Sequence, residues 1–252
     1  MKKYLAGLML AVLSCGVLFC ETDDMFRKAK AMQKEKQYSD AIKTYRNFLK
    51  KLPDAKESLD AQYNIGMCYS KIKDYDNAVK EFQIVVDKYP DSKKAVDAIL
   101  QIGGIYQNKQ KRYTNAINTY QMVIDKYPDS KKAVDAYLQI GGVYQKKQKK
   151  YENAIKIYQV VIDKYPDSKK VVNAQFELGA CYEKMKNDKK AIEEYQKVIN
   201  NFPDSKKAEN AKEKIAKLKG QKVETKDKKD TVKKKKPSKV EEDLPEPDDD
   251  EE

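Results

Sequence analysis

The sequence contains no histidine and no tryptophan, and only three of its 52 basic residues are arginines. Imidazole is the commonest metal ligand in proteins and the side chain whose ordinary pKa lies nearest neutrality. The absence of histidine therefore excludes Ser-His-Asp and Cys-His hydrolases and histidine-ligated zinc sites. The sequence also carries no phosphate-binding loop, metal-ligand cluster or nucleophile beside a base. We expect a protein that is not an enzyme and that uses no cofactor and no metal.

The positive charge comes almost entirely from lysine. The chain has 252 residues, with 52 Lys and Arg against 40 Asp and Glu, for a formal net charge of +12. Arginine is the preferred residue for reading guanine and for bidentate phosphate contacts, so its scarcity disfavours a nucleic-acid partner. Binding to another polyanion is a further alternative, and it predicts an affinity that falls steeply as salt rises.

The first twenty residues have the layout of an export signal. Lys2 and Lys3 precede an uncharged run over 4–20, and the next charge is Glu21. A short basic start, an apolar stretch and a polar continuation are typical of a secretory signal peptide. We therefore expect residues 1–20 to direct the chain out of the cytoplasm, to the periplasm of a bacterium.

Two cysteines inside this stretch raise the possibility of a lipid anchor. The sequence Val12-Leu13-Ser14-Cys15 resembles the lipobox of bacterial lipoproteins, whereas Cys20 follows a bulky phenylalanine and matches it less well. Cys15 is thus the favoured lipidation site and Cys20 the alternative. Ordinary cleavage near residue 20 and an uncleaved anchor are the other interpretations, although 17 uncharged residues are at the short limit for spanning a bilayer.

A period of 37 to 38 residues organises the rest of the chain. The string KYPDSKKAVDA occurs at 88–98 and again at 126–136, and KYPDSKKVVNA follows at 164–174. Self-similarity at this period predicts stacked repeats rather than a single globular core. The repeating proline stands at Pro53, Pro90, Pro128, Pro166 and Pro203.

Each unit has the pattern of two helices. Apolar residues at helical spacing precede each proline, which ends that helix. A serine two residues after the proline is placed to cap the next helix, at Ser92, Ser130, Ser168 and Ser205. A glycine in the middle of a helix costs about 1 kcal/mol relative to alanine, so we expect close contact between paired helices at Gly66, Gly103, Gly141 and Gly179.

On these residues the units resemble tetratricopeptide repeats. Unit two carries Gly66, Ala78 and Pro90 at the family's spacing, with Tyr69 and Phe82 between them. Units three and four have one extra residue between their helices, and unit one has Ala29 in place of the glycine. The structural alanines and prolines of units two to five are Ala78, Ala116, Ala154 and Ala191, and Pro90, Pro128, Pro166 and Pro203.

The resemblance implies an all-α solenoid of five helix-turn-helix units. We place the units at about 22–55, 59–92, 96–130, 134–168 and 172–205, followed by a capping helix over 206–218. Residues 219–252 are rich in Lys, Asp, Glu and Pro, first basic and then acidic. Because they offer little apolar surface, we expect a disordered tail.

Tetratricopeptide arrays bind peptides or protein segments in a concave groove lined by the first helix of each unit. The resemblance implies that the residue three before the glycine faces that groove, giving Phe26, Tyr63, Leu100, Leu138 and Phe176. Four residues after the glycine stand Ser70, Gln107, Gln145 and Glu183, with small residues such as Gly104 and Gly142 between. This pattern predicts an apolar floor with amides that bond a peptide backbone. In the alternative interpretation these side chains only pack against neighbouring helices.

Other recurring residues are expected to be structural. Cys68 and Cys181 occupy equivalent helix positions three units apart, which predicts small buried side chains rather than a disulfide. The paired lysines after each serine, as in Lys93-Lys94, predict a solvated ridge repeated along the array.

An export signal followed by such repeats resembles two bacterial envelope families. One is the BamD-type outer-membrane assembly lipoproteins, built of five such repeats on a lipid anchor. The other is the CpoB (YbgF) group of the Tol-Pal system, which the stretch from Tyr195 to Lys219 resembles closely. Both imply a protein–protein interaction scaffold with envelope proteins as partners, in outer-membrane assembly or, alternatively, in coordinating the envelope during division.

Overall fold

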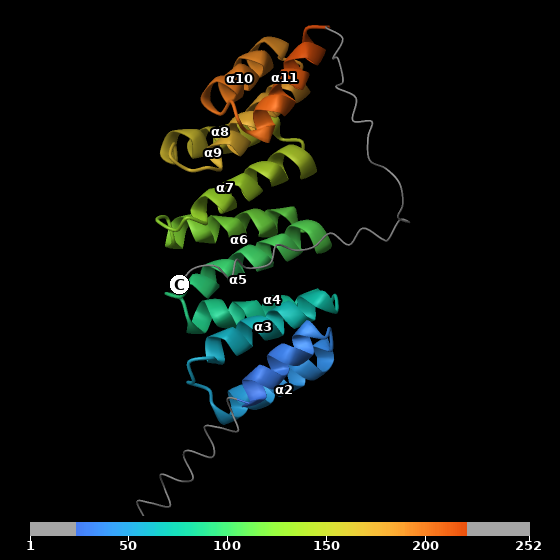
Figure 1. The fold of residues 1–252 in the computed structure, drawn as a ribbon, viewed down its shortest axis with the longest axis vertical. Helices are drawn as coiled ribbons and strands as arrows, with labels where there is room; N and C mark the ends of the chain where they lie inside the picture. Colours follow the sequence, from blue (N-terminus) through green and yellow to red (C-terminus); the bar gives the residue numbers. More distant parts are fainter. Residues whose placement is uncertain (1–23, 221–252) are drawn as a thin grey trace, which may run out of the picture.

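A computed structural model describes residues 24–220, and every regular element in this range is helical. The helices stack in chain order into one elongated array (Figure 1). The prediction of an all-α solenoid of five helix-turn-helix units is confirmed. The predicted signal peptide, both lipidation candidates and nearly all of the predicted tail lie outside the described residues.

Each unit pairs one first helix with one second helix. A helix over 24–34 and α2 (Tyr38–Lys51) form unit one, and α11 (Lys206–Leu218) follows unit five. Each helix packs on the next, and α11 packs on both α10 and α9. The remaining elements are α3 (Ser58–Lys71), α4 (Tyr75–Lys88), α5 (Lys93–Gly104), η1 (Ile105–Lys109), α6 (Tyr113–Lys126), α7 (Ala133–Gly142), η2 (Val143–Lys147), α8 (Tyr151–Lys164), α9 (Val171–Lys184) and α10 (Asp188–Asn201).

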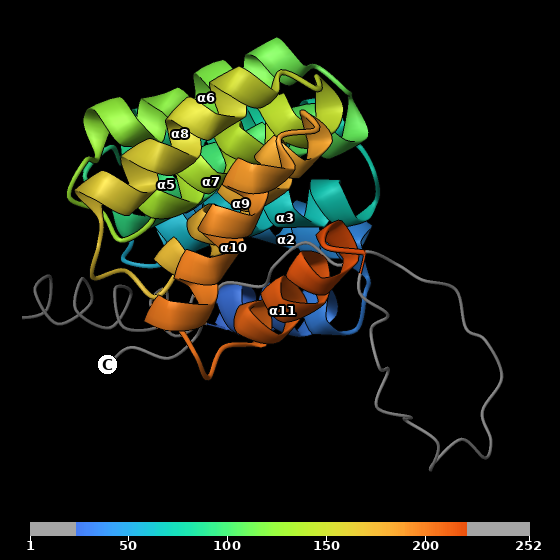
Figure 2. The same cartoon turned by 90° about the horizontal axis from the view of Figure 1, so that it is seen from above.

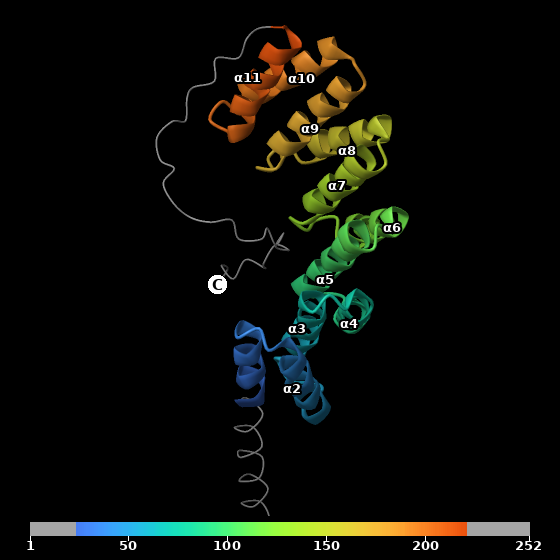
Figure 3. The ribbon, with the colours of Figure 1, turned by 90° about the vertical axis from the view of Figure 1, so that its right-hand side faces the viewer.

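The array is curved, with its two kinds of helix on different sides. In Figure 3 the second helices α4, α6 and α8 lie along the right-hand edge, and the first helices α5, α7 and α9 lie to their left. Seen from above, the helices fan around the long axis rather than lying in one plane (Figure 2). First helices of successive units therefore share one surface, which we call the inner face.

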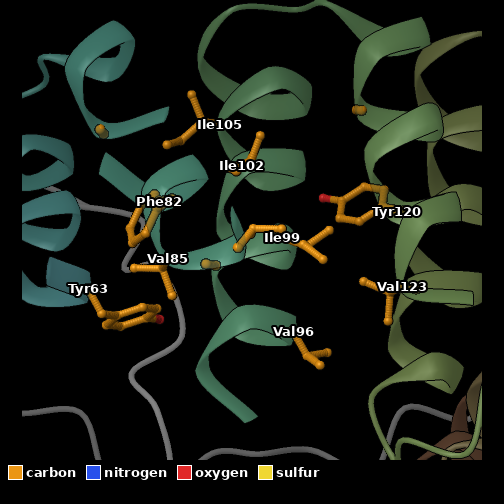
Figure 4. Packing of buried hydrophobic residues seen from close by; sticks show 14 of the residues in the cluster. Tyr63, Phe82, Val85, Val96, Ile99, Ile102, Ile105, Tyr120 and Val123 are labelled. Carbon is orange, nitrogen blue, oxygen red and sulfur yellow. The ribbon is translucent and has the colours of Figure 1, made fainter. Parts of the chain in front are cut away.

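The core lies between the paired helices and between successive units. Ile99 and Ile102 of α5 pack between Phe82 of α4 and Tyr120 of α6 (Figure 4). The four structural alanines Ala78, Ala116, Ala154 and Ala191 are all completely buried. The structural prolines Pro90, Pro128, Pro166 and Pro203 are exposed, and each is the second residue after the end of a second helix.

The glycines allow the paired helices to approach closely, as expected. A Cβ added to Gly103 would lie 2.4 Å from a ring carbon of Tyr120, and one added to Gly141 would lie 2.4 Å from Tyr158. At Gly66 and Gly179 the same clash occurs at 2.7 and 2.9 Å. An aromatic ring of the second helix thus rests directly on the backbone of the first helix in units two to five.

The extra residue in units three and four is accommodated inside the first helix. The carbonyl of Ile105 accepts from the N–H of Gln110 at 3.1 Å, and that of Val143 accepts from Gln148 at 3.0 Å, which are π-helical i to i+5 bonds. The segments η1 and η2 absorb the insertion, so the contact between the paired helices is preserved. All units then turn through a lysine with left-handed backbone, at Lys36, Lys73, Lys111, Lys149 and Lys186.

Serine capping is confirmed at two of the four predicted positions. The hydroxyls of Ser92 and Ser205 accept from the N–H of Ala95 and Ala208, each at 3.1 Å. The prediction is wrong for Ser130 and Ser168, because α7 and α9 begin only at Ala133 and Val171. Their hydroxyls instead accept from the N–H groups of Lys132 and Lys170 in a turn that precedes the helix.

Candidate peptide-binding surface

A hollow of about 230 Å³ opens on the inner face across units three to five. It is formed by η1, α7, η2, α9 and the start of α11, with one tyrosine from α8 beneath. These five segments of the array therefore contribute to one surface, which we call the inner hollow. Its lining residues are Gln107, Leu138, Gln139, Gly142, Lys146, Lys147, Tyr158, Asn173, Glu177 and Lys207.

Two of the predicted groove residues, Gln107 and Leu138, lie in this lining. Gly142 lies one helical turn after Leu138, and a Cβ added to it would meet no described atom within 4 Å. Lys146 follows one turn later on the same helix face. The inner hollow thus combines an apolar side chain, an open glycine and an amide, as the sequence pattern suggested, and the binding of a peptide to it stays a prediction.

The aromatic residues predicted for the groove are covered by the protein itself. Tyr63 is 2% exposed and its ring lies 5.3 Å from that of Phe82. Phe176 is 9% exposed and lies 5.2 Å from the ring of Tyr195. For these two the packing interpretation describes the structure, because each ring completes the contact between paired helices.

Phe26 and Leu100, the two remaining residues of the predicted apolar floor, are partly buried. Phe26 packs on the rings of Tyr45 and Phe48 at 5.8 and 5.6 Å. Leu100 packs against the core shared by units two to four. The five predicted residues therefore do not form a continuous apolar floor. Of these five, Leu138 lines the inner hollow.

The polar side chains that stand four residues after the glycine position accept hydrogen bonds from tyrosine hydroxyls of the second helices. The Tyr120 hydroxyl donates to Oε1 of Gln107 at 3.1 Å, and the Tyr158 hydroxyl donates to Oε1 of Gln145 at 3.0 Å. Unit one repeats the arrangement between Tyr45 and Gln33 at 3.0 Å, and unit five between Tyr195 and Glu183 at 2.8 Å. These acceptors fix the aromatic rings over the glycines, a role that the sequence interpretation had not given them.

Unit two lacks both members of this bond. Phe82 stands in the place of the tyrosine, and the buried Ser70 hydroxyl has no hydrogen-bond partner among the described residues. We expect Phe82→Tyr alone to lower the free energy of unfolding by about 1 kcal/mol, since its hydroxyl would be buried without a full-length acceptor. Adding Ser70→Gln should restore that loss. A double-mutant cycle followed by urea unfolding measures the coupling between positions 82 and 70. If Phe82→Tyr alone were as stable as Phe82→Tyr with Ser70→Gln, the pairing would be contradicted.

Glu183 also ties the last helix to unit five. Burial raises the pKa of this carboxyl, but hydrogen bonds from the Tyr195 hydroxyl and from Lys214 Nζ at 3.0 Å, with the charge of Lys214, leave its pKa below the ordinary value. A lowered pKa means that the ionised form stabilises the fold above the ordinary glutamate pKa and that this stabilisation is lost as the pH falls through the lowered pKa. We therefore expect the docking of α11 on α9 to weaken in acid.

In three of the four lysine pairs the second lysine links neighbouring units. Lys94 lies 3.6 Å from Asp60, Lys132 lies 2.5 Å from Asp97, and Lys170 lies 2.6 Å from Asp135. We call these contacts the lysine–aspartate ladder. The side chains of these three lysines are 32%, 44% and 47% exposed, so they lie on a partly solvated ridge, and each also joins the start of one first helix to the first helix before it.

The two cysteines within residues 24–220 have no reactive thiol. Cys68 and Cys181 are free and completely buried. Burial raises the pKa of each thiol to about 12, so both stay protonated at neutral pH. Within residues 24–220 there is also no cluster of three metal-binding side chains, and no helix is long and apolar enough to cross a membrane.

Comparison with protein families agrees with this geometry. A tetratricopeptide repeat model matches residues 25–55, 60–92, 97–130, 135–168 and 173–205. The chain belongs to the tetratricopeptide repeat family. Tetratricopeptide repeat proteins are typically non-enzymatic scaffolds, and this one is a protein–protein interaction scaffold of that type.

Solved structures share the tetratricopeptide fold at low identity. MamA from Desulfovibrio magneticus RS-1 is 20% identical, with 73% of this chain and 98% of that chain covered at a TM-score of 0.53. YrrB, described as having an unusual peptide-binding site, is 19% identical (75% and 90% covered, TM-score 0.51). A protein from Parabacteroides merdae is 11% identical (79% and 74% covered, TM-score 0.58). Among curated proteins, none matches this chain.

Sequence reasoning missed most of the polar lining of the inner hollow. Gln139, Lys146 and Glu177 lie on the same helix faces as the residues it chose, and Lys207 belongs to the capping helix. Lys146 could have been found by extending the four-residue spacing from Leu138 through Gly142. Lys207 could not, because its place depends on how α11 docks on α9.

Proposed function

We propose that this tetratricopeptide repeat protein is an exported scaffold of the bacterial cell envelope that captures a peptide or protein segment in the inner hollow. The observation that carries the proposal is the open stretch around Leu138 and Gly142, where first helices of successive units leave space at backbone level. The Gln107 amide and the lysines at its rim can bond a peptide backbone and acidic side chains. YrrB, which has a similar fold, is described as having a peptide-binding site.

The envelope assignment is supported by the sequence outside the described residues. Residues 1–20 have the pattern of an export signal, and acylation of Cys15, or of Cys20, would tether the array to a membrane. Five repeats behind such a signal favour a BamD-like role in outer-membrane protein assembly, at a periplasmic location. Mass spectrometry of the mature N-terminus would distinguish acylation from simple cleavage.

A role in the Tol-Pal system is the second candidate. The observation that favours it is the stretch from Tyr195 to Lys219, which is similar to the end of CpoB-type proteins. In the structure this stretch is the end of α10 together with α11. Both candidates use the same inner hollow and differ in the partner that it captures.

The test is a pull-down from detergent-solubilised envelope with the full chain as bait. Enrichment of outer-membrane assembly components supports the first candidate, and enrichment of Tol-Pal components supports the second. Gly142→Trp should reduce capture at least about tenfold, because an indole would fill the inner hollow where a partner backbone would lie. Gly142→Ala is the matched control and should retain capture. Undiminished capture by Gly142→Trp would exclude the inner hollow as the binding site.

A further inference from the structure

We propose that the acidic segment 241–252 of this chain docks at the Lys207 end of the inner hollow and competes there with the captured partner. The regulatory part of this inference rests on the proposed function, whereas docking itself does not require a partner. The argument depends on a break in the lysine–aspartate ladder, on the charge of the hollow and on the reach of the chain.

The ladder breaks at its last step. Asp60, Asp97 and Asp135 each stand six residues before the glycine of their unit, and the equivalent residue of unit five is Asn173. Lys207 is the next lysine of the series, but it has no carboxylate partner among the described residues. Its ammonium lies over the ring of Phe176, 4.4 Å from the centroid.

This break lies in the wall of the inner hollow. Asn173 and Lys207 both line it, so the carboxylate that pairs with the lysine in the other units is missing at a point where Lys207 faces the hollow. A carboxylate entering from outside can complete the same ion pair that the ladder makes internally. An acidic peptide is therefore the chemistry that this end of the inner hollow fits.

The surrounding charges favour the same ligand. The lining holds three lysines, Lys146, Lys147 and Lys207, against one acid, Glu177. Lys146 already pairs with Glu177 at 3.2 Å. Lys147 and Lys207 remain as cations without a carboxylate among residues 24–220.

The chain carries a matching segment within reach. Residues 241–252 contain nine acids and no base. Lys207 lies roughly 18 Å from the end of α11 at the helical rise per residue. The 22 steps from Lys219 to Glu241 span at most roughly 79 Å. A tethered segment acts at an effective concentration on the order of millimolar, so even weak docking would be populated.

Docking can be measured with a dye-labelled synthetic peptide of residues 241–252. The acceptor is the full chain in which those nine acids are replaced by their amides. We expect the peptide to bind this acceptor about tenfold more tightly than the unmodified chain, whose own segment competes. In the acceptor, Lys207→Gln and Asn173→Asp should each weaken peptide binding about fivefold. Lys207→Gln removes the cation that the peptide would pair with, and Asn173→Asp supplies a carboxylate of the protein that pairs with Lys207 in place of the peptide.

Lys212→Gln is the matched control, because Lys212 is an exposed lysine on the same helix. Equal losses for Lys207→Gln and Lys212→Gln would show diffuse attraction of a polyanion and overturn the proposal. Equal affinity of the peptide for the unmodified and neutralised chains would also overturn it. Specific peptide binding without any gain of partner capture by the neutralised chain would support docking and overturn the competition. The proposed function fails separately, if Gly142→Trp leaves capture undiminished.

Discussion

Replacing Tyr120 by alanine is expected to lower the free energy of unfolding by about 4 kcal/mol. The ring is 2% exposed, fills the space between α5 and α6 and covers Gly103. Its hydroxyl also holds Gln107 in the inner hollow. Tyr120→Phe keeps the ring and loses only the hydrogen bond, so it should lose about 1 kcal/mol. Urea unfolding followed by far-ultraviolet circular dichroism measures both.

The comparison of the two variants separates packing from hydrogen bonding. Each repeat contacts only its neighbours, so Tyr120→Ala can divide the array into two transitions. A loss from Tyr120→Phe as large as that from Tyr120→Ala would contradict the account, because it would place the stabilisation in the hydroxyl rather than the ring.

Replacing Gly103 by alanine is expected to destabilise the array by about 2 kcal/mol, although alanine favours helix more than glycine does. The added Cβ would lie 2.4 Å from the Tyr120 ring, which is packed between helices and cannot move aside. Gly142→Ala is the control in the next unit. Its Cβ meets open space, so the variant should gain up to about 1 kcal/mol from helix propensity.

The clash can be tested by removing the ring. In a Tyr120→Ala background, Gly103→Ala should no longer destabilise, since the methyl group enters the space that the ring has left. An unchanged loss from Gly103→Ala in that background would show that the glycine is needed for another reason. Ala29 of unit one already carries a methyl group here, and it is buried in a cluster with Ala41 and Tyr45 of α2.

Sequence predicted the paired helices well because their contact depends on local spacing. The twelve or thirteen residues from glycine to alanine set which ring meets which glycine, and the structure places Tyr120 on Gly103 and Phe82 on Gly66 accordingly. The proline period likewise gave the number and order of the units. These features repeat with the chain and do not depend on the curvature of the array.

The inner hollow was harder to predict because it depends on how successive units rotate. Leu138 and Phe176 occupy the same position in their units, yet Leu138 lines the inner hollow and Phe176 is covered by Lys207. The difference arises where α11 takes the place of a sixth unit's first helix. The spacing of residues within one unit does not determine such contacts between units.

The residues that accept hydrogen bonds from the tyrosines could be predicted only in part. Gln107 and Gln145 were expected to bond a ligand, and their oxygens instead accept from tyrosines of their own units. The joint change to Phe82 and Ser70 in unit two was visible in the sequence and would have indicated this pairing. The side-chain periodicity alone could not distinguish an amide facing a ligand from one facing the second helix.

The most direct test of the central claim is photo-crosslinking from the inner hollow in living cells. A benzophenone amino acid at Leu138 should crosslink the partner, and the same group at Gln159, an exposed residue of α8, should not. Strong crosslinking from position 138 alone is the result that the account predicts. Equal crosslinking from both positions, or crosslinking only from position 159, would contradict capture in the inner hollow.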